Sequence, residues 1–139
     1  MAATVDSYLA GLSTSVRTIM RSVIKTMSAQ GCEAYVKTIY VGFDIAGEMV
    51  AAAYGRANHV EIAVALDEDH PGLGLKDATH LTWRTLPVCL ELSSATEVNE
   101  AEPLLREACS RVKQGAHEVY RDNDHFATAR ERRLGSRRP

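Results

Sequence analysis

The hydrophobic period of the chain changes twice, and this change constrains the fold more than any other feature of the sequence. From Val5 to Gln30, apolar residues recur every three or four positions, which predicts an amphipathic helix with a weak point at Gly11. Runs rich in β-branched residues follow, and a second helical stripe begins near Thr96. A chain that passes from helix to strands and back to helix predicts a two-layer α+β domain.

Four runs have the composition or the alternation of β-strands. They are Tyr35–Phe43, Met49–Tyr54, His59–Leu66 and Trp83–Leu92. Short connections join the first three, as in an antiparallel meander, whereas residues 67–82 are rich in polar residues, Pro and Gly and predict a long loop. We therefore expect one antiparallel sheet of four to five strands, with the N-terminal and C-terminal helices packed on one face and the other face partly open.

Composition and cysteine usage limit the class of protein. The 139 residues are 45% hydrophobic and 24% charged, as in one globular domain. No apolar run reaches the ~20 residues of a membrane span, and the N-terminus lacks the features of a signal peptide, so we expect a cytoplasmic protein without membrane contact. The three cysteines fit a reducing compartment, and Cys89 and Cys109 are interpreted as small core residues.

Charge is distributed unevenly along the chain. The formal net charge is −2, but residues 121–139 contain six arginines against three acids. We interpret residues 1–120 as a single α+β domain and residues 121–139 as a basic C-terminal tail, either helical or disordered. As a nucleic-acid contact, the tail would use Arg130, Arg132, Arg133, Arg137 and Arg138. The alternative is a solvated terminus.

Several segments resemble a known family. They are Val5–Leu12, Lys37–Phe43, His59–Leu66 and Asp77–Trp83, and the match covers Val5 to Val112. They resemble a bacterial domain-of-unknown-function family labelled "predicted transport protein", which has distant iron-chaperone relatives that resemble frataxin. The resemblance implies a binding or accessory module more than an enzyme, and the frataxin-like relatives imply weak iron binding through exposed acids.

A group of polar and aromatic side chains is expected to line the open face of the sheet or its rim. The candidate ligand-binding residues are Lys37, Tyr40, Tyr54, Arg56, His59, Glu61, His80, Trp83 and Arg84. Cationic and aromatic groups of this kind suit a phosphate or carboxylate ligand. The alternatives are a solvated face with a cross-strand pair between Arg56 and Glu61, and a Trp83 that packs on the core.

Motifs for metal binding and catalysis are missing from the sequence. His59, Glu61 and the acidic run at residues 67–70 match neither a calcium loop nor H-E-x-x-H, so we predict no metal site and no cofactor. The chain contains no G-x-S-x-G, P-loop or G-x-G-x-x-G motif either. These observations favour a non-catalytic role, and an enzyme is the third class after the binding functions.

The sequence therefore predicts a non-catalytic module that recognises an anionic small molecule or a protein partner on the open sheet face. It is expected to form a homodimer through an exposed sheet edge or the C-terminal segment. One alternative is an accessory protein that binds nucleic acid through the arginine-rich tail. The other is a weak iron- or metal-binding protein of the chaperone kind.

Overall fold

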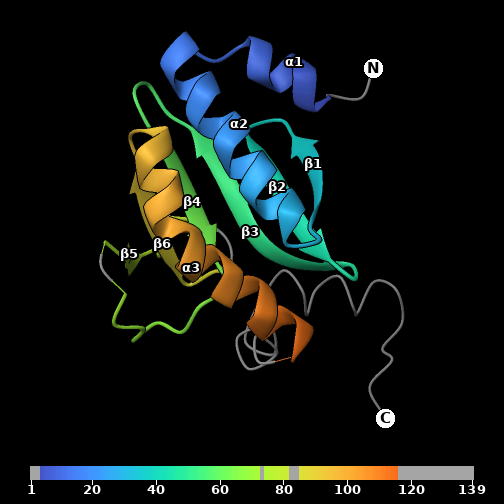
Figure 1. Cartoon of the computed structure of the whole chain (residues 1–139), viewed down its shortest axis with the longest axis vertical. Coiled ribbons are helices and arrows are strands. Elements are labelled where there is room, and N and C mark those ends of the chain that lie inside the picture. Colours follow the sequence, from blue (N-terminus) through green and yellow to red (C-terminus); the bar gives the residue numbers. More distant parts are fainter. Residues whose placement is uncertain (1–3, 73, 82–84, 116–139) are drawn as a thin grey trace.

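The computed structural model describes residues 4–72, 74–81 and 85–115, which form an antiparallel sheet and the helices packed against it (Figure 1). The sheet has six strands in the order β1-β2-β3-β4-β6-β5. The elements are α1 (Val5–Ala10), α2 (Thr14–Ala29), β1 (Glu33–Lys37), β2 (Tyr40–Ile45), β3 (Glu48–Gly55), β4 (Val60–Val64), β5 (Lys76–Asp77), β6 (Val88–Leu92) and α3 (Ala95–Lys113). The predicted α+β class is confirmed, with α2 and α3 lying across one face of the sheet (Figure 1).

The N-terminal helical stripe is divided at the predicted weak point. Thr4 caps α1 through a capping box with Ser7, and α1 ends at Gly11. Ser13 then caps α2, where its hydroxyl oxygen accepts a hydrogen bond from the backbone N–H of Val16. The helical period therefore continues through a short break that the caps define.

The C-terminal helix α3 is continuous through a proline. Its N-cap is Ser94, and Pro103 lies inside the helix. Leu105, Cys109 and Val112 are among its buried residues, so α3 presents an apolar stripe to the core. Of the described helices, none combines the length and apolarity that crossing a membrane requires.

The sheet has more strands than the four to five that the sequence predicts. The expected run Tyr35–Phe43 is divided into β1 and β2 by a tight turn at Thr38-Ile39, since Lys37 pairs with Tyr40. Neither turn residue is a glycine, asparagine or aspartate, so the local sequence has no hairpin signal. The other addition, β5, lies in the expected loop and pairs with β6. A two-residue strand is set by its partner rather than by its own composition.

Strand alternation separates two kinds of residue onto the two faces of the sheet. One cross-strand row is apolar and belongs to the core under α2 and α3: Val41, Ala53, Ile62 and Leu90. The next row projects to the opposite face and is polar or aromatic: Tyr54, Glu61 and Glu91. The register of β3, β4 and β6 therefore brings the predicted site residues to the face away from the helices.

Candidate functional site

Glu61 on β4 is the centre of the polar cluster on this face. It is a buried charged residue with only 8% of its surface exposed. Its Oε1 accepts hydrogen bonds from Arg56 Nη2 at 2.6 Å and Nε at 3.1 Å, and its Oε2 accepts one from His80 Nε2 at 2.6 Å. Burial opposes ionisation, but the hydrogen bonds from Arg56 and His80 prevail and hold the pKa of Glu61 below its ordinary value. Glu61 is therefore an ionised carboxylate bound from two sides.

Cys89 on the neighbouring strand β6 adds a thiol to the cluster. Its Sγ lies 3.8 Å from Glu61 Oε2 and 3.6 Å from the backbone carbonyl oxygen of Asp77. The residue is 1% exposed. Burial, followed by the nearby Glu61 carboxylate, raises the pKa of the Cys89 thiol to about 11. Cys89 is therefore a neutral thiol at physiological pH.

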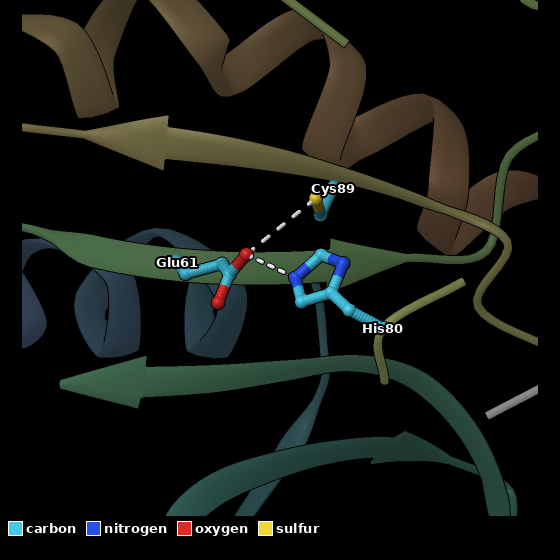
Figure 2. Close-up of side chains that lie close together, drawn as sticks. All are labelled: Glu61, His80 and Cys89. Carbon is cyan, nitrogen blue, oxygen red and sulfur yellow. Dashed lines mark hydrogen bonds and ion pairs between the residues drawn. The ribbon is translucent and has the colours of Figure 1, made fainter. Parts of the chain in front are cut away.

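Three different donor atoms converge at this point of the sheet. One ligand atom each from Glu61, His80 and Cys89 lies within 4.8 Å of the other two. Figure 2 shows the three side chains close together, with a contact from Glu61 to each of the other two. Glu61 and Cys89 are buried on adjacent strands, whereas the His80 side chain is 51% exposed. The cluster therefore has two donors on the rigid sheet and a third at the solvent side.

A short turn after β5 places His80 against the strands. Asp77 Oδ1 accepts hydrogen bonds from the backbone N–H of Thr79 at 3.2 Å and from its hydroxyl at 2.6 Å. Ala78 N–H donates to Pro87 O at 2.9 Å, which ties the turn to the segment before β6. The local hydrogen bonds between Asp77 and Thr79 therefore shape the turn, and the contact with Pro87 positions it beside the sheet.

Arg56 is held by aromatic side chains as well as by Glu61. Its guanidinium carbon lies 4.9 Å from the centroid of the Tyr54 ring, within the range of a cation–π contact. Tyr54 in turn packs against Tyr40, with ring centroids 5.5 Å apart. The Arg56 side chain is still 40% exposed. It can therefore hold the carboxylate and also face solvent.

The structure brings together some of the predicted site residues and separates others. Those that converge are Tyr40, Tyr54, Arg56, Glu61 and His80. The sequence left open a cross-strand pair between Arg56 and Glu61 in place of a ligand site, and the structure contains this pair.

Other predicted residues lie apart from this cluster. His59 Nδ1 lies 2.9 Å from Asn58 Oδ1 in the β3–β4 turn, and Lys37 is exposed at the end of β1. Trp83 and Arg84 lie outside the described residues, as does the whole predicted tail with its five candidate arginines, so their roles stay predictions.

Cys89 is the site residue that sequence reasoning missed. It is buried, as the interpretation as a small core residue requires, but its thiol faces Glu61 and Asp77. Alternation with Val88 and Leu90 could have revealed this, because it places Cys89 on the face away from the helices.

The acidic run at residues 67–70 does not join Glu61. Asp67 forms an ion pair with Arg111, and His70 Nε2 lies 2.9 Å from Glu107 Oε2. Both partners are on α3, so this run is held against the helix. In the sequence, these acids formed one candidate metal group with Glu61 and His59. The structure instead places Glu61 beside His80 and Cys89.

The fold and the cluster define an α+β protein with an antiparallel sheet and a mixed carboxylate, imidazole and thiol site. The chain matches no protein-family model, no curated protein and no solved structure. The resemblance to the "predicted transport protein" family therefore stays a prediction, and the function is argued from the site itself.

Proposed function

We propose that this chain is a metal-binding protein whose ion is Zn²⁺ or a chemically similar divalent transition metal. The ligands are Glu61 Oε2, His80 Nε2 and Cys89 Sγ. The observation that supports this function is the convergence of these three donor atoms, from three separate segments, within 4.8 Å of one another.

The donor set selects the class of ion. Zn²⁺ accepts oxygen, nitrogen and sulfur ligands together, whereas Ca²⁺ and Mg²⁺ require oxygen ligands. A thiolate among the donors favours soft or borderline ions over hard ones. The site therefore fits Zn²⁺ better than the iron that the frataxin-like resemblance implies, since exposed acids are not its main donors.

The cluster needs a small rearrangement to hold such an ion, because Glu61 Oε2 and His80 Nε2 are 2.6 Å apart and must separate. Bonds of about 2.0–2.3 Å in a tetrahedron space the ligand atoms by roughly 3.5 Å. Glu61 and Cys89 are buried on paired strands, but the half-exposed His80 is on a turn and has room to adjust. Forming the site is therefore chiefly a movement of the His80 side chain.

Electrostatics favours a cation between these groups. Burial, and then the carboxylate of Glu61, raise the pKa of the Cys89 thiol, and a divalent cation would oppose both effects and release the thiol proton on binding. Arg56 already binds Glu61 Oε1, so it would orient the carboxylate while Oε2 binds the metal. The Arg56 hydrogen bonds on Oε1 are therefore compatible with ion binding, whereas the hydrogen bond from His80 Nε2 to Oε2 would be replaced by the metal.

The predicted anionic ligand has a place in this proposal. Three protein ligands leave a fourth coordination position, which takes water or an anion. Without a metal, recognition of an anion is less well supported, because Arg56 and His80 already donate hydrogen bonds to Glu61. A carboxylate or phosphate would instead bind the metal beside the partly exposed Arg56.

The experiment that tests the proposal is a titration of the chelator-treated, full-length protein with Zn²⁺ and Co²⁺. We expect one ion per chain by calorimetry, and a thiolate-to-Co²⁺ charge-transfer absorption band that Cys89→Ser removes. Glu61→Gln, His80→Ala and Cys89→Ser should each weaken binding at least about tenfold. His59→Ala is the matched control, since His59 lies against Asn58 and should leave the affinity unchanged. Variants that bind Zn²⁺ as tightly as the unmodified chain would contradict this site.

Two further properties belong to the same proposal. Buried free thiols at all three cysteines support a cytoplasmic location, where thiols stay reduced.

A homodimer would use the exposed edge strand β1, which lies at one end of the strand order. Sedimentation of the full chain with and without Zn²⁺ tests the dimer, and a monomer in both states would exclude it.

A further inference from the structure

A second sulfur cluster lies on the helix-covered side of the protein and takes no part in the metal site. Cys32 Sγ and Cys109 Sγ are 3.6 Å apart, although 77 positions separate them in the sequence. Cys32 lies between α2 and β1, and Cys109 lies on the buried stripe of α3. Both residues are buried, free thiols. The pair therefore brings the segment between α2 and β1 into contact with α3.

Local contacts hold the segment that carries Cys32 in place. The backbone N–H of Cys32 donates to Met27 O at 3.2 Å, and Gly31 has a φ of +94°, which closes the end of α2. From α3, Lys113 Nζ donates to Gln30 O at 3.4 Å. The segment before β1 is therefore bound to α2 through its backbone and to α3 through the Lys113 side chain.

The pair has the electrostatics of a reactive dithiol. The two thiols share a hydrogen bond, and this bond, aided by the charge of Lys113, lowers the pKa of Cys109. The same bond, together with burial, raises the pKa of Cys32. Cys109 is thus the thiol that ionises first, and Cys32 is the neighbour that keeps its proton.

We propose that Cys32 and Cys109 form an oxidative modification site, a dithiol that small hydroperoxides convert into an intrachain disulfide. A disulfide has an S–S bond of about 2.05 Å, so the sulfurs approach by roughly 1.5 Å. This inference is independent of the proposed metal function, since it uses neither Glu61, His80 nor Cys89.

The chemistry balances with one hydroperoxide per disulfide. The Cys109 thiolate attacks the terminal peroxide oxygen, the O–O bond breaks, and the leaving oxygen takes a proton to become water or an alcohol. The product is a sulfenic acid on Cys109. The Cys32 sulfur then attacks the Cys109 sulfur, the S–O bond breaks, and water leaves with the Cys32 proton. Two thiols are oxidised, and the peroxide gains the two electrons.

Burial selects the oxidant. Cys32 is 8% exposed and Cys109 is 1% exposed, so a molecule the size of hydrogen peroxide has far easier access than glutathione disulfide. Cys89 is excluded as a partner because its Sγ lies near Glu61 and Asp77 on the other face of the sheet. The expected product therefore has one specific linkage and one remaining thiol.

The test is peroxide treatment of the reduced, metal-free full-length protein, followed by alkylation and peptide mapping without reduction. We expect the intact mass to fall by two hydrogens, one linked peptide pair containing Cys32 and Cys109, and alkylation at Cys89 alone. Closing a loop this long should raise the melting temperature by about 10 °C. Glutathione disulfide at the same concentration should give little of this product.

Variants separate this site from the metal site. Cys89→Ser should keep the linkage, whereas Cys32→Ser and Cys109→Ser should each abolish it. Mapping of the unmodified chain needs no variant, so a substitution that prevents folding does not leave the question open. Three alkylated cysteines after peroxide, a linkage to Cys89, or linkage only between chains would each overturn the proposal.

Discussion

The three cysteines lie in two environments that the sheet separates. On the helix-covered side, Cys32 and Cys109 face each other at 3.6 Å. On the other face, Cys89 lies near the carboxylate of Glu61 and within 4.8 Å of the imidazole of His80. All three thiols are buried, yet their neighbours differ in kind.

Under the two proposals, the neighbours of a buried cysteine decide its chemistry. Two thiols in contact favour oxidation to a disulfide, because each supplies the partner that the other needs. A thiol beside a carboxylate and an imidazole favours metal binding, because the three supply the donors of a zinc site. The strands between the two clusters keep these chemistries apart.

The largest expected effect tests whether the helix-covered face supplies most of the stability. Ile62 is fully buried on β4, next to Glu61 but on the opposite face. Ile62→Ala should lower the free energy of unfolding by about 3 kcal/mol, because it leaves a cavity under the helices. Ile39→Ala is the matched control, since Ile39 is 65% exposed and should cost little. Urea denaturation measures the free energy of unfolding of both variants. Equal costs would mean that Ile62 is not packed in the core under the helices.

A smaller effect is expected at the edge of the other face, where packing is tight. A Cβ at Gly42 would lie 2.2 Å from the ring of Tyr35, its cross-strand partner. Gly42→Ala should therefore destabilise the protein by about 2 kcal/mol, since the Tyr35 ring must move. Gly11→Ala is the control, because a Cβ there meets its nearest atom at 3.5 Å.

A double-mutant cycle sharpens this test. In a Tyr35→Ala background, the cost of Gly42→Ala should largely disappear, because the clashing ring is gone. Additive costs in thermal or urea unfolding would show that the ring does not lie over Gly42 in solution.

The smallest expected effect concerns Glu61 in the metal-free protein. Its pKa is lowered in the fold, so its stabilising contribution is present above the unfolded-state value of 4.5 and is lost as pH falls through the lower folded value. Glu61→Gln should cost about 1 kcal/mol at pH 7, because solvent screens the partly exposed Arg56 and His80. The difference from the unmodified chain should shrink below pH 4.5. A difference that stays constant with pH in chelator-containing buffer would contradict the ion-pair assignment.

Much of the fold could be predicted from local patterns. The helical period from Val5 and its weak point at Gly11 correspond to α1 and α2. Alternation on His59–Leu66 correctly separates Val60 and Ile62 from Glu61. The division at Thr38-Ile39 and the strand β5 could not be predicted, because neither has a turn signal or a strand-length run of its own.

The sites were predicted less completely than the fold. Arg56 and Glu61 are five positions apart around a hairpin, so their pairing could be proposed from sequence. His80 and Cys89 reach Glu61 only through the pairing of β6 with β4 and the turn after β5. No spacing rule for metal motifs covers donors that lie 19 and 28 positions from Glu61.

The sequence by itself determined the helical regions, most of the extended segments, and which residues of a strand share a face. These properties depend on neighbours within a few positions, because the periods of 3.6 and 2 are local. The tertiary structure alone decided that Cys89 and His80 lie near Glu61 and that Cys32 faces Cys109. Such contacts depend on strand order and on the packing of α3 over the sheet, where burial of apolar area acts without regard to distance along the chain.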